Sequence, residues 1–184
     1  MRIVGGERKG THLVAPKGDA TRPTSDRLRE TIFNIVFHRF GELLDGGRVL
    51  DLFAGSGAMG LEALSRGAAF ALFVENGVAA RGALRSNIDA LAAAGRTRVW
   101  RRDATKLGDC PVPAFGLVFC DPPYGRGLGE LALVSAAAGG WAAPGGLAVL
   151  EERQGAMPES IEGWERVDLR TAGESAIGFF SRTP

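Results

Sequence analysis

The sequence predicts an α/β fold in which helices cover a mostly parallel β-sheet. From residue 49 onward, short β-rich runs alternate with helical stretches, and a glycine turn follows the first run. The β-rich runs are Val49–Phe53, Ala69–Glu75, Thr97–Arg102, Phe115–Cys120 and Gly146–Glu151. The helical stretches are Ala58–Arg66, Val78–Ala93 and Leu128–Ala138. Strand–helix–strand units of this kind pair in parallel through right-handed crossovers, so we expect these runs to form one sheet.

The pattern changes after Pro158, where two β-rich runs follow each other closely. These runs, Trp164–Leu169 and Ala176–Phe180, are separated by too few residues for a helical crossover. Such neighbours pair antiparallel, and we expect them at one edge of the sheet. The sequence therefore predicts a seven-stranded, mostly parallel sheet with an antiparallel C-terminal strand.

A small extension is predicted before the sheet. Ile3–Val4 and Thr11–Ala15 read as the short strands of a β-hairpin with a basic tip. Thr24 or Ser25 then caps a helix, whose apolar residues recur at helical spacing. Glycines from residue 41 to residue 47 predict a break. We therefore expect a hairpin-and-helix extension at residues 1–40 and a main domain at residues 41–184.

Charge is concentrated in the extension. The whole chain has a net charge of +1, but residues 1–40 contain eight Lys and Arg against four Asp and Glu. A basic arm beside a near-neutral body favours nucleic-acid binding, because cations replace the counterions of the phosphate backbone. Arg8, Lys9 and Arg27 are candidate contacts. A solvated surface face is the competing interpretation.

Composition limits the remaining possibilities. The 184 residues, 45% of them hydrophobic, suit one compact domain, alone or with a small appendage. The sequence has neither an apolar run of about 20 residues nor a signal peptide, so we expect a cytoplasmic protein without a membrane segment. Cys110 and Cys120 predict neither a disulfide framework nor a metal pair. His12 and His38 are isolated, so no metal site is expected.

The glycine turn after the first strand predicts a cofactor site. Gly55, Gly57 and Gly60 form a GxGxxG pattern that opens a helix. Glycines let the backbone approach a ligand closely, and the helix N-terminus offers free N–H donors. Glu75, at the end of the second strand, can accept hydrogen bonds from ribose hydroxyls. The pattern alone fits a nicotinamide dinucleotide, S-adenosylmethionine, or a tight turn that binds nothing.

One acidic residue favours S-adenosylmethionine. Asp51 lies in the strand before the turn, where its carboxylate can hold an α-amino group and would repel a pyrophosphate. Asp103, after the third strand, can accept a bond from an adenine amine or can simply be a turn residue. The candidate cofactor-binding residues near the sheet are Asp51, Phe53, Ala54, Gly55, Ser56, Gly57, Glu75 and Asp103.

The tetrapeptide Asp121-Pro122-Pro123-Tyr124 follows the fourth strand and predicts the chemistry. Prolines lack an N–H, so the carbonyls of Asp121 and Pro122 remain available as acceptors. Acceptors for both protons of a base amine can aim the nitrogen lone pair at a methyl donor. Tyr124 offers a face on which a base can stack. These four residues are the candidate catalytic residues, although Asp-Pro-Pro also simply terminates strands.

These motifs together resemble a known class of enzymes. Asp51-Leu52-Phe53-Ala54-Gly55-Ser56-Gly57, Glu75 and the tetrapeptide resemble class I S-adenosylmethionine-dependent methyltransferases that methylate amines. Gly10, the segment 21–34 and the closing residues 173–180 look like the bacterial 16S ribosomal RNA guanine-N2 methyltransferases. The resemblance covers almost the entire chain. It implies a Rossmann-like fold, S-adenosyl-L-methionine as cofactor and a guanine in small-subunit ribosomal RNA as target.

The resemblance also implies roles for the segment after the hairpin. In that family this segment lies over the cofactor, so Thr21, Arg22, Pro23 and Thr24 are candidate contacts to its methionine end. Phosphate binding or surface ion pairs are equally open for Arg22 and Arg27. The expected partner is the ribosomal RNA or the assembled small subunit, and we expect a monomer.

Three alternatives stay open. The same tetrapeptide pattern occurs in adenine-N6 and cytosine-N4 methyltransferases, so an adenine-N6 methyltransferase acting on DNA or RNA is one alternative. A dehydrogenase that uses the glycine turn to bind a nicotinamide dinucleotide is a second. A non-catalytic RNA-binding assembly factor is the third.

Overall fold

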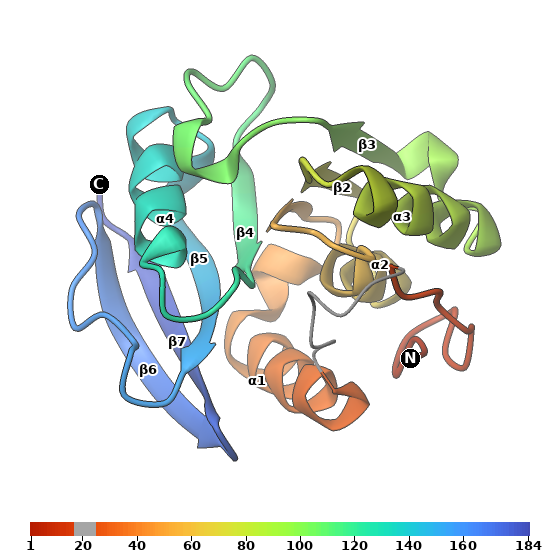
Figure 1. Ribbon diagram of the computed structural model, residues 1–184, viewed down its shortest axis with the longest axis horizontal. Coiled ribbons are helices and arrows are strands. Elements are labelled where there is room, and N and C mark those ends of the chain that lie inside the picture. Colours follow the sequence, from red (N-terminus) through yellow and green to blue (C-terminus); the bar gives the residue numbers. More distant parts are fainter. Residues whose placement is uncertain (17–24) are drawn as a thin grey trace.

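The computed structural model describes residues 1–16 and 25–184, which form a seven-stranded sheet covered by helices (Figure 1). The sheet order is β3-β2-β1-β4-β5-β7-β6. The strands are β1 (Arg48–Leu52), β2 (Phe70–Val74), β3 (Thr97–Trp100), β4 (Phe115–Cys120), β5 (Ala142–Arg153), β6 (Trp164–Ala172) and β7 (Ser175–Arg182). The helices are α1 (Asp26–Leu44), α2 (Ala58–Ser65), α3 (Val78–Ala90) and α4 (Leu128–Ala138), with short 3-10 turns η1 (Ala94–Arg96) and η2 (Ala104–Lys106).

The strand pairing confirms the predicted topology. Strands β1 to β5 pair in parallel, and β7 pairs antiparallel with both β5 and β6. The chain passes from β1 outward through β2 and β3, then returns to place β4 on the other side of β1. This reversal of strand order is a topological switch point, where ligands bind beyond the carboxyl ends of the strands. The fold therefore brings the ends of β1 and β4 together.

Side chains alternate between the two faces of the sheet and fill two cores. Val49, Phe73 and Phe119 pack with α1, α2 and α3 in one core. Leu50 and Val118 belong to the other core, which includes residues of α4 and η2. Buried parallel strands need apolar residues on both faces, because helices cover each side. This explains why the strand sequences are continuous hydrophobic runs.

Helix α1 is longer than the sequence predicts. Its N-cap is Ser25, whose hydroxyl accepts a hydrogen bond from the backbone N–H of Leu28 at 3.2 Å. The backbone leaves helical geometry at Phe40 (φ −141°, ψ 30°), next to the break predicted from Gly41, and a further helical stretch continues to Leu44. Leu44 is buried in the core that α1 shares with the sheet. The division expected after residue 40 therefore coincides with a kink in α1, and it stays a prediction.

The N-terminal segment, residues 1–16, forms a minimal hairpin with only one antiparallel bridge, between Arg2 and His12. Its two strands share backbone bonds from Ile3 N–H to Thr11 and from Leu13 N–H to Met1, both at 3.0 Å. The N–H groups of Val4 and Val14 donate instead to Glu62 of α2 at 2.8 Å and to Asn87 of α3 at 2.7 Å. Bonds to neighbouring helices therefore take the place of further ladder bonds.

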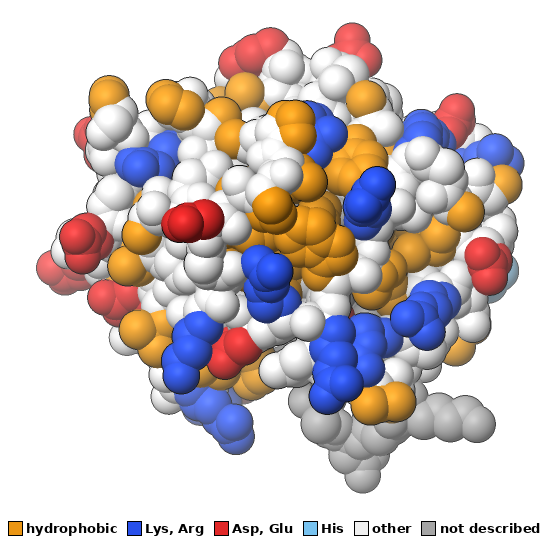
Figure 2. Space-filling model, turned by 90° about the horizontal axis from the view of Figure 1, so that it is seen from above, with side chains coloured by type: hydrophobic (Ala, Val, Ile, Leu, Met, Phe, Trp, Pro, Cys, Tyr) orange, Lys and Arg blue, Asp and Glu red, His pale blue; other side chains and the backbone are white. Residues whose placement is uncertain are grey.

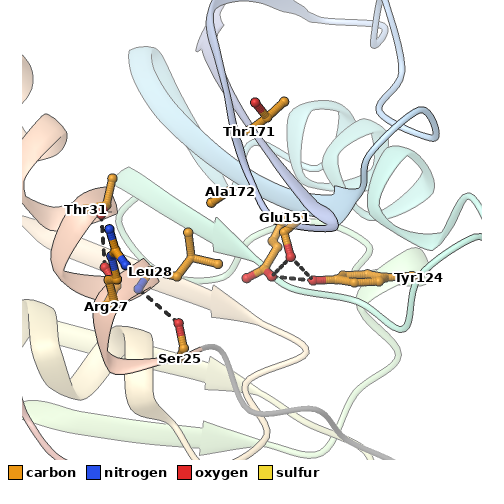
Figure 3. Close-up of a pocket in the computed structure, with 10 residues that line it drawn as sticks. Ser25, Arg27, Leu28, Thr31, Tyr124, Glu151, Thr171 and Ala172 are labelled. Atoms are coloured by element: carbon orange, nitrogen blue, oxygen red, sulfur yellow. Dashed lines mark hydrogen bonds between the residues drawn. The ribbon is translucent and has the colours of Figure 1, made fainter.

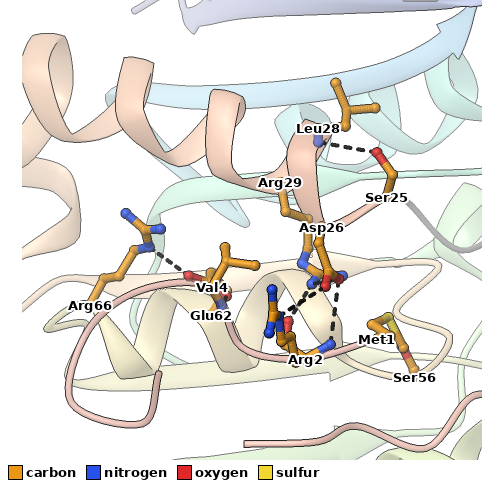
Figure 4. A network of polar contacts seen from close by, with 10 residues as sticks. All are labelled: Met1, Arg2, Val4, Ser25, Asp26, Leu28, Arg29, Ser56, Glu62 and Arg66. Carbon is orange, nitrogen blue, oxygen red and sulfur yellow. Dashed lines mark hydrogen bonds and ion pairs between the residues drawn. The ribbon is translucent and has the colours of Figure 1, made fainter. Parts of the chain in front are cut away.

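Buried charged groups hold this segment in place (Figure 4). Glu62 is fully buried and accepts from the Val4 N–H at 2.8 Å and from Arg66 at 2.7 Å. Arg29 is also fully buried, and its guanidinium donates to the Arg2 carbonyl and to Asp26. Buried charges are tolerated when they are paired and hydrogen-bonded. These contacts join the N-terminal segment to α1 and α2.

Lysine and arginine side chains surround an apolar area on the face seen from above in Figure 2.

Arginines also stack on aromatic rings in this protein. The guanidinium of Arg48 lies 4.5 Å from the ring centre of Phe70 and 5.0 Å from that of Phe115. That of Arg102 lies 5.1 Å from the Trp100 ring. Such contacts cover apolar surface while keeping the charge near water.

We predict that Gly57→Ala destabilises the fold. Gly57 has φ +79°, and an added Cβ would lie 2.2 Å from Leu84 Cδ1. Backbone strain and overpacking together should cost about 2–4 kcal/mol, which would lower the melting temperature by roughly 5–10 °C. Gly82→Ala is the matched control, because Gly82 lies exposed in α3 with no atom near its added Cβ. Gly82→Ala should stabilise by about 1 kcal/mol. Equal melting temperatures for the two variants would contradict the claim that a side chain at position 57 strains the backbone and overpacks the core.

Candidate active site

Three acidic residues meet at the carboxyl edge of the sheet. Asp51 lies in β1, Glu75 follows β2 and Asp121 follows β4. The register pairs Leu52 of β1 with Val74 of β2 and with Cys120 of β4, so the three strands end side by side. The charges of Asp121 and Glu75 are close enough to raise the pKa of Asp51. The sequence analysis named all three residues, and the fold brings them together.

The loop between β1 and α2 has a constrained backbone. Gly55 and Gly57 have φ of 55° and 79°, in the left-handed region that favours glycine. Phe53 also has a positive φ, of 57°, although it has a side chain. Backbone strain of this kind occurs mainly where a function requires a fixed geometry. A Cβ at Gly55 would meet only the Phe53 carbonyl oxygen, at 3.9 Å, so the backbone there is open to close approach.

Asp51 is a buried carboxyl group that holds the start of α2. Its side chain is 2% exposed, and Oδ2 accepts a hydrogen bond from the Gly60 N–H at 2.9 Å. Burial raises the pKa of Asp51 well above its ordinary value, and the charges of Asp121 and Glu75 raise it further. A cation bound nearby would favour the ionised form.

Glu75 supports the glycine loop from the neighbouring strand. One carboxylate oxygen accepts from the Gly55 N–H at 2.8 Å, and the other accepts from the Gly77 N–H at 2.7 Å. A carboxylate has about four acceptor positions in total. Glu75 can therefore hold the loop and also accept from a ligand hydroxyl, as the sequence analysis expects.

This set of groups fits S-adenosylmethionine better than a dinucleotide. The ligand carries a positive sulfonium and a positive α-amino group, and both are attracted to a cluster of carboxylates. A pyrophosphate would be repelled by the same cluster. Asp51 and Glu75 would hold the ligand, and the open backbone at Gly55 would allow it to approach.

The other expected cofactor residues have other contacts. Asp103 is exposed and accepts from the N–H of Thr105 at 2.9 Å and from its hydroxyl at 2.7 Å; these bonds lower the Asp103 pKa. Asp103 thus acts as the N-cap of η2, and a bond to adenine stays a prediction. The carbonyl of Ser56 accepts from Asn87, while Ala54 is buried behind the loop. Thr21, Arg22, Pro23 and Thr24 lie outside the described residues.

The tetrapeptide begins where β4 ends. Asp121 is half-buried, Pro122 is buried and Pro123 is exposed. The hydroxyl of Tyr124 donates to Glu151 and lies 3.0 Å from the hydroxyl of Ser175. Burial raises the pKa of Tyr124 above its ordinary value, and the bond to Glu151 raises it further. Tyr124 therefore remains a neutral phenol whose ring is held from its hydroxyl end.

A cavity of about 520 Å³ opens beside Tyr124 (Figure 3). It lies between the start of α1, the tetrapeptide and the turn from β6 to β7, and its polar lining includes Ser25, Arg27, Thr31, Tyr124, Glu151 and Ser175. This volume is in the usual range of small-molecule pockets. The cavity is therefore large enough to hold an unstacked base.

Glu151 and Ser175 are site residues that the sequence analysis did not name as candidates. Both are buried, at 6% and 9% exposed, and the Ser175 hydroxyl donates to Glu151 at 3.1 Å. The next residue, Glu152, accepts from the Gly125 N–H at 3.0 Å and so holds the loop after the tetrapeptide. The sequence signal that could have indicated Glu151 is the pair of acidic residues, Glu151 and Glu152, near the end of the buried strand β5, which neighbours β4.

The three basic candidates separate into two places. Arg27 lines the cavity. Arg8 and Lys9 are exposed on the N-terminal segment, where the Arg8 N–H donates to Ser65 at the last residue of α2. The glycine loop lies at the first turn of the same helix, so Arg8 and Lys9 are at the far end of α2.

Within residues 1–16 and 25–184, no group of three or more His, Cys, Asp or Glu side chains is arranged to hold a metal ion. Within the same ranges, no helix combines the length and the apolar character needed to span a bilayer.

The chain is similar to known proteins over almost its entire length. The family described as "Conserved hypothetical protein 95" matches residues 1–181. Ribosomal RNA small subunit methyltransferase D of Escherichia coli strain K12 is 36% identical over 183 residues, covering 99% of this chain and 90% of the relative. The solved structure of the E. coli protein yhhF superposes with a TM-score of 0.83 at 35% identity, covering 100% of this chain and 98% of that one.

A more distant structure shares the fold. An RNA methyltransferase from Salinibacter ruber, in complex with S-adenosyl-L-homocysteine, has a TM-score of 0.67 at 12% identity and covers 88% of this chain and 94% of its own. The fold and the acidic glycine-loop site define a class I S-adenosylmethionine-dependent methyltransferase. Within that class, the chain belongs to the Conserved hypothetical protein 95 family.

We predict opposite effects of Asp51→Asn on stability and on ligand binding. A carboxyl group with a raised pKa destabilises the fold above that pKa, and the effect disappears below the ordinary value. At pH 8 the variant should therefore have a higher melting temperature than wild type, and the difference should shrink toward pH 4. Calorimetry should show affinity for S-adenosylhomocysteine falling about 10- to 100-fold, because the charge attraction is lost.

Asp89→Asn is the control for this substitution, since Asp89 is exposed on α3. It should change neither property. A melting temperature of Asp51→Asn below that of wild type at pH 8 would contradict the raised pKa of Asp51.

Proposed function

We propose that this chain methylates the exocyclic N2 amine of a guanine in 16S ribosomal RNA of the small subunit. The observation that carries the proposal is that Asp121 lies close to Asp51 of the acidic cofactor site, while Tyr124, three residues further on, lines a cavity of about 520 Å³. The E. coli relative supports the substrate class, because its name describes a methyltransferase of small-subunit ribosomal RNA. The guanine-N2 assignment rests on the resemblance of the motifs.

The tetrapeptide would activate the amine. The amine of a base is conjugated with its ring and is a weak nucleophile. The Asp121 carboxylate and the carbonyls of Asp121 and Pro122 would accept hydrogen bonds from the two N–H groups of the amine. These bonds favour a tetrahedral nitrogen with an exposed lone pair. When bound, S-adenosylmethionine supplies a methyl group whose C–S bond breaks as the N–C bond forms, leaving the electron pair on sulfur. Asp121 would then accept the proton that the positively charged nitrogen releases.

Tyr124 would hold the base. A base must leave its stack to reach an enclosed site, and an aromatic face replaces part of the lost stacking. The Tyr124 hydroxyl is fixed by Glu151 and Ser175, so its ring presents a defined face to the incoming base. Unpaired loop nucleotides are the RNA elements that proteins can splay out in this way.

The basic residues would bind the RNA backbone. Arg27 at the cavity is placed for a phosphate next to the target base, and Arg8 and Lys9 for phosphates farther along the RNA. Residues 1–40 would thus contact RNA, and the segment 21–24 would cover the cofactor. The partner would be free ribosomal RNA or the assembled small subunit, bound by a cytoplasmic monomer.

The test is mass spectrometry of nucleosides from unmethylated small subunits treated with enzyme and S-adenosylmethionine. Wild type should form N2-methylguanosine. Asp121→Ala should lower the rate by about a thousandfold or more, because amine activation is lost, with affinity for S-adenosylhomocysteine within about threefold of wild type. Asp109→Ala, an exposed loop substitution, should match wild type. Formation of N6-methyladenosine alone would favour the adenine alternative and overturn the guanine assignment.

Lys9→Ala should weaken RNA binding through lost charge. If Lys9 contacts one phosphate, the slope of log affinity against log salt should decrease by about 0.7–0.9. Filter binding of small-subunit RNA at several salt concentrations measures this slope. Arg166→Ala is the control, because Arg166 lies on β6, at the sheet edge opposite β3. An unchanged slope for Lys9→Ala, or an equal change for both variants, would remove Lys9 from the RNA contact.

A further inference from the structure

A buried glutamate lies at the inner wall of the cavity. Glu151 in β5 is 6% exposed, and the same carboxylate oxygen accepts hydrogen bonds from the hydroxyls of Tyr124 and Ser175. Figure 3 shows Glu151 and the Tyr124 hydroxyl pointing toward each other at the cavity. Glu151 therefore lies directly beside the ring on which we place the base.

Glu151 is also the neighbour of Asp121 across the sheet. The register pairs Cys120 of β4 with Leu150 of β5, so Asp121 and Glu151 follow side by side on adjacent strands. Both residues line a small void of about 10 Å³, which has Ile32 and Met59 on its other sides. A group bound at Asp121 would therefore also lie close to Glu151.

Glu151 presents a carboxylate at this buried position beside Tyr124. A carboxylate is a stronger acceptor and has about four acceptor positions. It is therefore suited to take an N–H from a ligand in addition to holding the two hydroxyls.

The edges of the purines differ at the atom beside the amine. In guanine, the N2 amine is next to the ring N1–H, which is a donor. In adenine and in 2-aminopurine, the ring nitrogen next to the amine carries a lone pair instead. A carboxylate at this position attracts the first edge and repels the second, because an acceptor would face an acceptor.

We infer that Glu151 is a specificity-determining residue that accepts the guanine N1–H while Asp121 accepts from the N2 amine. The inference rests on the proposed guanine-N2 function and deepens it. Glu151 selects the base, Tyr124 and Ser175 orient Glu151, and Asp121 activates the amine. Discrimination against adenine is thereby built into the end of β5.

The test compares guanine with 2-aminopurine at the modified position of reconstituted small subunits, once mass spectrometry has located that position. 2-Aminopurine keeps the 2-amine and lacks N1–H. Wild type should prefer guanine by about a hundredfold or more in kcat/KM, because a site built for a donor rejects an analogue that lacks it. Glu151→Gln should reduce this preference at least about tenfold, because the amide can donate to the ring nitrogen of 2-aminopurine.

Glu152→Gln is the matched control. Glu152 is equally buried and holds the neighbouring loop, so its substitution should change both rates in parallel and leave their ratio unchanged. Melting curves and binding of S-adenosylhomocysteine report whether each variant is folded. The wild-type preference needs no variant, so the inference remains testable if Glu151→Gln does not fold.

The outcomes separate the two proposals. Absence of N2-methylguanosine with wild type would overturn the proposed function. Formation of N2-methylguanosine together with equal rates on guanine and 2-aminopurine would overturn only the role of Glu151. A full preference for guanine in folded Glu151→Gln, or an equal loss of preference in Glu152→Gln, would also overturn that role.

Discussion

The site depends on carboxylates held close together by backbone N–H groups at one edge of the sheet. Asp51 accepts from Gly60 and Glu75 accepts from Gly55, so two strands fix the loop between β1 and α2. Burial raises the pKa of Asp51, and the like charges of Asp121 and Glu75 raise it further. Their proximity is therefore a cost to the free protein that a cationic ligand relieves. The same groups that shape the loop thus define which ligand it accepts.

Much of the fold could be predicted because the relevant signals are local. The buried strands are continuous apolar runs, and the order of strands and helices leaves few topologies. Predictions were incomplete where tertiary contacts add to local preference. A further helical stretch with the buried Leu44 follows the kink at Phe40. The expected hairpin strands bond in part to Glu62 and Asn87 of neighbouring helices.

The residues of the candidate site also differ in whether the sequence could predict them. Asp51, Glu75 and Asp121 could be placed together because each ends a strand of one parallel sheet. Glu151 and Ser175 could not, since their contacts with Tyr124 join residues 27 and 51 positions away and depend on sheet register. Asp103 is a local case, because its bonds to Thr105, two residues further on, match the turn role that the sequence left open. Long-range register, which no short motif encodes, completes the base side of the site.

The central claim is that the acidic edge selects a cationic methyl donor over an anionic dinucleotide. Calorimetry that titrates the wild-type protein separately with S-adenosylmethionine and with NADH tests it most directly. We predict saturable binding of S-adenosylmethionine and none of NADH, because the pyrophosphate of NADH would face Asp51, Glu75 and Asp121. Binding of NADH without binding of S-adenosylmethionine would contradict the account.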